Sequence, residues 1–164
     1  MTVQTEIYSL AKKLGQVLLS RNLRCTVAES CTGGSLAAAI TDIPGSSQWF
    51  DRGFITYSNQ AKQQMLGVPE QMIASQGAVS EAVVRAMAER ALAISDANVS
   101  VAISGVAGPG GGSREKPVGS VWLAWAAYKQ PTHAQCYLFP GDRFAVRQHA
   151  VRVALEGLIS KLRK

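Results

Sequence analysis

Short β-prone segments alternate along this chain with segments whose apolar residues recur at helical spacing. The β-prone segments are residues 25–28, 53–57, 99–103, 118–127 and 136–139. Strands that alternate with helices predict a layered α/β fold in which helices cover both faces of the sheet. Because no helical pattern separates 118–127 from 136–139, these two segments are expected to form an antiparallel hairpin. Several of the other strands should be parallel, since helical crossovers join them.

The helical segments are recognised by apolar periodicity and by capping residues. One face of the opening helix is predicted to carry Ile7, Leu10, Leu14, Val17 and Leu18. Residues 35–41 predict a short helix after the first strand, and Ser58 or Asn59 can cap another after the second. Ser80 and Asp142 can cap two longer helices. The buried stripe of the first of these is predicted to contain Val84, Met87, Ala91 and Ile94.

Length and charge limit the function classes. The 164 residues fit one domain, 1–164. No apolar run approaches the roughly 18–20 residues that span a bilayer, and the N-terminus does not resemble a signal peptide. We therefore expect a cytoplasmic protein without a membrane partner. The formal net charge of +6 suits an anionic ligand. The sequence has no basic patch interleaved with aromatic residues, so nucleic-acid binding is not expected.

The titratable side chains do not form a metal site in the sequence. The three cysteines, Cys25, Cys31 and Cys136, are scattered, which argues against a disulfide framework and against zinc spacing. Cys25 and Cys136 lie in apolar stretches and are expected to be buried. Glu29 and Asp42 are isolated, so paired acid–base carboxylates are not evident. No metal and no cofactor are expected.

The segment after the first strand is the strongest candidate for chemistry. It reads Glu29–Ser30–Cys31–Thr32–Gly33–Gly34. Ser30 would lie beyond the carboxyl end of a strand, where α/β sheets collect ligands. The amides of residues 31–34 would be the unpaired donors of a helical first turn, able to stabilise an oxyanion, and the two glycines would let a ligand approach. The alternative is that Ser30 is only a helix cap.

A serine nucleophile at this position needs a base. Cys31 is a competing nucleophile, because a thiol pKa can fall at a helix N-terminus. A catalytic cysteine or serine usually has a histidine partner, but the only histidines are His133 and His149, both expected at the surface. Lysine can act instead where burial or positive charge lowers its pKa from about 10.4.

Lys62 is the candidate base. It follows Tyr57–Ser58–Asn59 by about one helical turn, just past the second strand. Tyr57 could pass a proton or hold Lys62 in place. The alternative is that Lys62 is a solvated helix lysine.

A second glycine-rich segment, residues 104–113, follows a later strand. It matches neither the P-loop nor the dinucleotide-binding fingerprint. It is either a flexible surface turn or a binding loop at the same sheet edge as Ser30. Lys116, Arg143 and Arg147 could meet a phosphate nearby.

These motifs together resemble the C-terminal domain of CinA, the competence/damage-inducible protein family. The matching stretches are residues 28–34, 53–62, 77–80, 104–109, 111–113, 116–119 and 141–143, with Val146 and Arg147. The resemblance implies a three-layer α/β/α sandwich with a mixed, mostly parallel sheet. It also implies a homodimer. Gly110 stands where close relatives are expected to carry an acidic residue, a departure that concerns a detail of the loop.

The stand-alone members of that family are nicotinamide-nucleotide amidohydrolases. The resemblance therefore implies hydrolysis of nicotinamide mononucleotide to nicotinate mononucleotide and ammonia. Ser30 would be the nucleophile, with Lys62 and Tyr57 assisting. The residues expected to bind substrate are Cys31, Thr32, Gly33, Gly34, Asn59, Ser104, Gly105, Arg143 and Arg147. Two alternatives stay open: a non-catalytic nucleotide-binding regulatory module, and a hydrolase of a different amide.

Overall fold

A computed structural model describes residues 1–163 and contains one five-stranded sheet, in the order β2-β1-β3-β4-β5. The strands are β1 (Cys25–Glu29), β2 (Phe50–Ile55), β3 (Val99–Gly105), β4 (Ser120–Ala127) and β5 (His133–Leu138). β1 is parallel to both β2 and β3, whereas β3–β4 and β4–β5 are antiparallel. Every strand except β4 therefore points the same way, which confirms the mixed, mostly parallel sheet and the predicted hairpin.

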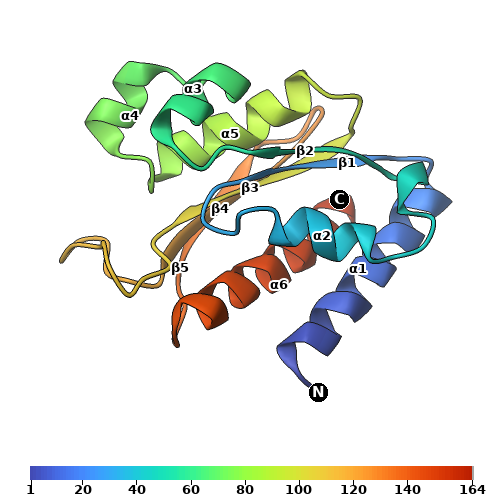
Figure 1. Cartoon of the computed structure of the whole chain (residues 1–164). Coiled ribbons are helices and arrows are strands. Elements are labelled where there is room, and N and C mark those ends of the chain that lie inside the picture. Colours follow the sequence, from blue (N-terminus) through green and yellow to red (C-terminus); the bar gives the residue numbers. More distant parts are fainter. Residues whose placement is uncertain (164) are drawn as a thin grey trace.

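Helices cover both faces of the sheet (Figure 1). One face carries α1 (Val3–Ser20), α2 (Ser35–Thr41) and α6 (Arg143–Leu162). The other carries α3 (Asn59–Leu66), α4 (Glu70–Gln76) and α5 (Glu81–Ala93). A short 3₁₀ turn, η1 (Ser46–Gln48), precedes β2. The arrangement is the predicted α/β/α sandwich, and each face of the sheet buries its own apolar cluster.

Caps and close packing explain where the helices begin and how they lie. The side chains of Ser58, Ser80 and Asp142 accept amide hydrogen bonds at the starts of α3, α5 and α6, as their positions predict.

Gly15 lets α1 approach the fully buried ring of Trp49, since a Cβ there would lie 2.7 Å from the ring atom Cε2. The close approach of α1 to Trp49 therefore depends on a missing side chain.

Several sequence expectations need correction. Cys136 is exposed, because β5 is an edge strand with little cover. Ile94 lies beyond the last residue of α5 and is 38% exposed, so it is not part of the buried stripe. β2 begins and ends earlier than the expected residues 53–57. The sequence does not predict α4, because this helix has one buried residue, Ile73, and so no repeating apolar stripe.

No helix within residues 1–163 is both long enough and apolar enough to cross a membrane.

Candidate active site

The candidate site lies where the carboxyl ends of three parallel strands meet. Ser30 follows β1, Lys62 lies on α3 after β2, and Ser104 is near the end of β3. Open α/β sheets bind ligands at this edge. A cavity of about 310 Å³, here called the strand-end cleft, is lined by Ser30, Cys31, Tyr57, Asn59, Lys62, Ser104, Gly105 and Arg143, with residues 106–108 and 110–112 of the glycine-rich loop. The sequence therefore identified most of the cleft's polar lining.

Ser30 and Lys62 are in direct contact. The Nζ of Lys62 donates a hydrogen bond to Ser30 Oγ at 3.0 Å. It also donates to the carbonyl oxygens of Thr56 at 2.9 Å and Tyr57 at 3.2 Å. Lys62 is 1% exposed, so the alternative of a solvated helix lysine is wrong.

The surroundings of Lys62 favour its neutral form. Burial lowers the pKa of Lys62 from its ordinary value, because the ammonium is removed from water. Within residues 1–163 no ion pair includes Lys62, and its acceptors are neutral carbonyls and a hydroxyl. A neutral lysine at this distance can accept the proton of Ser30.

Tyr57 supports the amine through its main chain. Its carbonyl oxygen accepts from Lys62 and, at 3.4 Å, from Ser30 Oγ. Its phenol instead accepts a hydrogen bond from Arg143 Nη2 at 3.2 Å. The expectation that Tyr57 holds Lys62 is met by the backbone, whereas the described residues show no hydrogen bond that would let the phenol pass a proton to either partner.

Glu29 organises the residues that follow Ser30, here called the serine turn (residues 30–34). The carboxylate is fully buried, and its Oε1 accepts from the amides of Gly34 at 3.1 Å and Leu36 at 3.0 Å. Its Oε2 accepts from the amide of Ala37 at 2.9 Å. In the sequence Glu29 is an isolated carboxylate, and its contacts with these amides are not evident. The signal that could have found it is an acidic residue just before a helix, where a carboxylate satisfies first-turn amides.

The free donors of the serine turn are fewer than expected. Gly34 donates to Glu29, and Gly33 donates to the carbonyl oxygen of Ser30 at 3.0 Å. Within residues 1–163 the amides of Cys31 and Thr32 make no hydrogen bond. The candidate oxyanion donors are therefore two amides rather than four.

The two glycines fit the backbone of the serine turn. Gly33 and Gly34 have φ values of +58° and +101°, a region that side chains disfavour. Neither lines the strand-end cleft, and Thr32 is completely buried. Contact of Thr32, Gly33 and Gly34 with substrate stays a prediction, and of their amides only that of Thr32 is without a hydrogen bond in residues 1–163.

The two arginines of α6 have different positions. Arg143 lines the cleft and donates to the carbonyl oxygen of Gly108 at 2.7 Å. Arg147 does not line it; its Nε donates to the carbonyl oxygen of Cys31, and its Nη2 to that of Thr32, both at 3.1 Å. Lys116 donates to the carbonyl oxygen of Gln76, away from the cleft lining. Of these three cations only Arg143 lines the cleft.

Cys31 is a poor rival to Ser30. Burial raises the pKa of its thiol to about 11, so little thiolate exists near neutral pH. The two histidines lie elsewhere: His133 stacks on Trp125 and His149 on Phe139. The geometry therefore favours the serine over the thiol.

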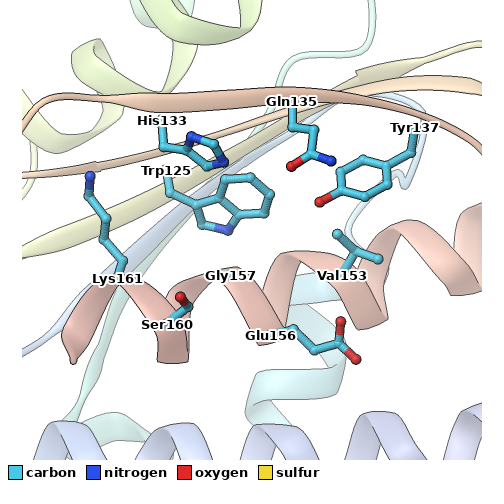
Figure 2. Close-up of a pocket in the computed structure, with 9 residues that line it drawn as sticks. All are labelled: Trp125, His133, Gln135, Tyr137, Val153, Glu156, Gly157, Ser160 and Lys161. Atoms are coloured by element: carbon cyan, nitrogen blue, oxygen red, sulfur yellow. The ribbon is translucent and has the colours of Figure 1, made fainter. Parts of the chain in front are cut away.

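A second cavity, of about 260 Å³, lies between α6 and the β4–β5 hairpin (Figure 2). His133, Gln135 and Tyr137 project from β5 toward α6, beside Trp125 of β4. Lys161 here donates to the carbonyl oxygen of Pro131 at 2.5 Å. The hydrogen bond between Lys62 and Ser30 belongs to the strand-end cleft, which is therefore the candidate active site. In residues 1–163, no group of three or more His, Cys, Asp or Glu side chains could hold a metal ion.

The fold and this site define the class of protein. The chain belongs to the CinA C-terminal domain family, whose model matches residues 7–162. It is 53% identical to the nicotinamide-nucleotide amidohydrolase PncC of Escherichia coli (strain K12), over 94% of this chain and 93% of that protein. It is 52% identical to PncC of Pseudomonas putida, over 93% and 95%. The crystal structure of the competence/damage inducible protein CihA from Agrobacterium tumefaciens superposes with a TM-score of 0.94 at 44% identity, covering 97% and 96% of the two chains.

Proposed function

We propose that this protein hydrolyses the carboxamide of nicotinamide mononucleotide to nicotinate mononucleotide and ammonia, with Ser30 as nucleophile and Lys62 as base. The observation that carries the proposal is the 3.0 Å contact between Lys62 Nζ and Ser30 Oγ at a buried position. The names of the relatives, nicotinamide-nucleotide amidohydrolases at about half identity, support the substrate.

The proposed reaction is acyl transfer in two halves. Neutral Lys62 takes the proton of Ser30 as Oγ attacks the carboxamide carbon, and the oxyanion accepts hydrogen bonds from the amides of Cys31 and Thr32. The Lys62 ammonium then protonates the departing nitrogen, which leaves as ammonia. Water attacks the acyl-enzyme with Lys62 again as base, releasing the carboxylate and restoring Ser30.

The rest of the cleft suits a phosphorylated ligand. Arg143 presents a guanidinium at the rim, and guanidinium groups bind phosphate well. Asn59, Ser104 and Gly105 line the same space and supply polar contacts for the substrate. We also propose that residues 1–164 work as one domain in the cytoplasm, as the sequence predicts, and as a homodimer, as the family resemblance implies.

An ammonia-release assay tests the proposal. Purified wild type, Ser30→Ala and a control, Ser75→Ala on the exposed side of α4, are incubated with nicotinamide mononucleotide and a chelator. We expect release by wild type and the control, and none by Ser30→Ala, with equal urea unfolding curves. Full activity of Ser30→Ala would refute the nucleophile. Thermal stabilisation of wild type by the nucleotide without ammonia would indicate a binding module, and release from a different amide alone would correct the substrate.

A further inference from the structure

We propose that Arg147 is a positioning residue that holds the serine turn so that its two free amides face the reacting carboxamide; the inference rests on the hydrolysis proposed above. Arg147 lies on α6, yet its hydrogen bonds go to the main chain of the turn. It therefore links a helix distant in sequence to the residues next to the nucleophile.

Peptide geometry gives the first argument. The carbonyl of Cys31 and the N–H of Thr32 belong to one peptide group, and in a trans peptide these two point in opposite directions. The only cis peptide in residues 1–163 is at Gly108–Pro109. Arg147 Nε holds the Cys31 oxygen at 3.1 Å, so the Thr32 N–H must point away from the guanidinium.

The preceding peptide repeats the pattern. The N–H of Cys31 shares a peptide group with the carbonyl of Ser30, and that oxygen accepts from the amide of Gly33 at 3.0 Å. Both free N–H groups thus belong to peptides whose oxygens are already held. Two adjacent unpaired donors after a nucleophile are what an oxyanion requires.

Charge is the next argument. Arg147 Nη2 also bonds the Thr32 carbonyl and, at 3.2 Å, Ser35 Oγ, so the cation lies against the carbonyl side of the turn. The Glu29 carboxylate lies against the amides at the other end. A cation on a carbonyl oxygen polarises the peptide and strengthens its N–H as a donor. The turn is held from both ends by opposite charges.

The same contacts argue against a phosphate role for Arg147. Its Nε and Nη2 are engaged by the turn, and it does not line the strand-end cleft, whereas Arg143 does. Loss of Arg147 should therefore slow the chemical step rather than weaken capture of the phosphate.

Kinetics with two substrates separate these roles. Wild type, Arg147→Met, Arg147→Lys and Arg143→Met are assayed with nicotinamide mononucleotide and with nicotinamide riboside, which has the same carboxamide and no phosphate. Arg147→Met should lower kcat at least tenfold by the same factor for both substrates, with KM nearly unchanged. Arg147→Lys should recover part of the loss. Arg143→Met should raise KM for the nucleotide alone. Arg152→Met, which removes ion pairs with Glu6 of α1 and Glu156 of α6, is the matched control.

An NMR measurement makes the test independent of turnover. The ¹⁵N–¹H resonances of Cys31 and Thr32 should shift or broaden in both Arg147 variants and stay unchanged in Arg152→Met. Unmoved resonances would overturn the inference whether or not the enzyme turns over. A rise in KM for the nucleotide that disappears with the riboside would instead assign Arg147 to the phosphate. Absence of ammonia from folded wild type would contradict the proposed function and leave the amide measurement to decide the inference.

Discussion

Replacing Lys62 by Met tests the buried amine through stability as well as activity. The side chain keeps a similar length but loses its charge and its three hydrogen bonds, to Ser30 Oγ and to the carbonyls of Thr56 and Tyr57. Loss of a general base should lower kcat by about 10²–10⁴-fold. In the wild type, activity should rise with pH as the amine becomes neutral, through a midpoint below the ordinary lysine value.

The stability effect has a definite sign. The pKa of Lys62 is lowered in the folded state, so between that value and about 10.4 the unfolded chain binds one more proton than the folded chain. Over that window the free energy of unfolding of wild type should rise relative to Lys62→Met by about 1.4 kcal/mol per pH unit. Below the folded-state pKa of Lys62, the buried amine must carry its charge. There the difference in unfolding free energy between wild type and Lys62→Met should be constant and least favourable to wild type.

Urea unfolding followed by tryptophan fluorescence, from pH 7 to 10.5, measures this difference. Lys13→Met, an exposed change on α1, is the control and should parallel the wild type. Parallel curves for wild type and Lys62→Met across the whole range would show that the pKa of Lys62 is not lowered. Undiminished ammonia release by Lys62→Met would show that Lys62 is not the base of the reaction.

Two further predictions concern the thiols and the core. Limited alkylation of the native protein should modify exposed Cys136 first and spare buried Cys31 and Cys25. Burial raises the thiol pKa of Cys31 to about 11 and that of Cys25 to about 12. Mass spectrometry locates the label, and early labelling of Cys31 would contradict its assigned burial. Gly15→Ala should destabilise the protein by about 1–3 kcal/mol although alanine favours helix, because the new Cβ would press on the Trp49 ring. A urea midpoint equal to or above that of the wild type would show that the contact relaxes freely.

The sequence predicted the parts of the site that depend on strand ends and helix caps. The position of Ser30 after β1 and of Lys62 on a helix capped by Ser58 followed from local patterns, and parallel strands then brought them to one edge. The spacing named Lys62 as the candidate base but left a solvated helix lysine as the alternative, and the resemblance to a family favoured the pairing with Ser30.

What the sequence missed depends on contacts between distant segments. Nothing local shows that Arg147 turns toward the carbonyls of residues 31 and 32, or that Glu29 occupies the amides of α2. The four-amide expectation failed for this reason. Exposure of Cys136 was missed because its apolar neighbours do not reveal that β5 lies at the sheet edge.

The acceptors that surround the Lys62 amine, apart from Ser30, are main-chain carbonyls. Side-chain substitution at Thr56 or Tyr57 would leave those oxygens in place, provided that the chain keeps its path between β2 and α3. The hydrogen-bond acceptors of the Lys62 amine therefore depend on the backbone path, and the side chains at neighbouring positions can change without removing them. A comparison of residue identities around the lysine would understate how well such a site persists among diverging relatives.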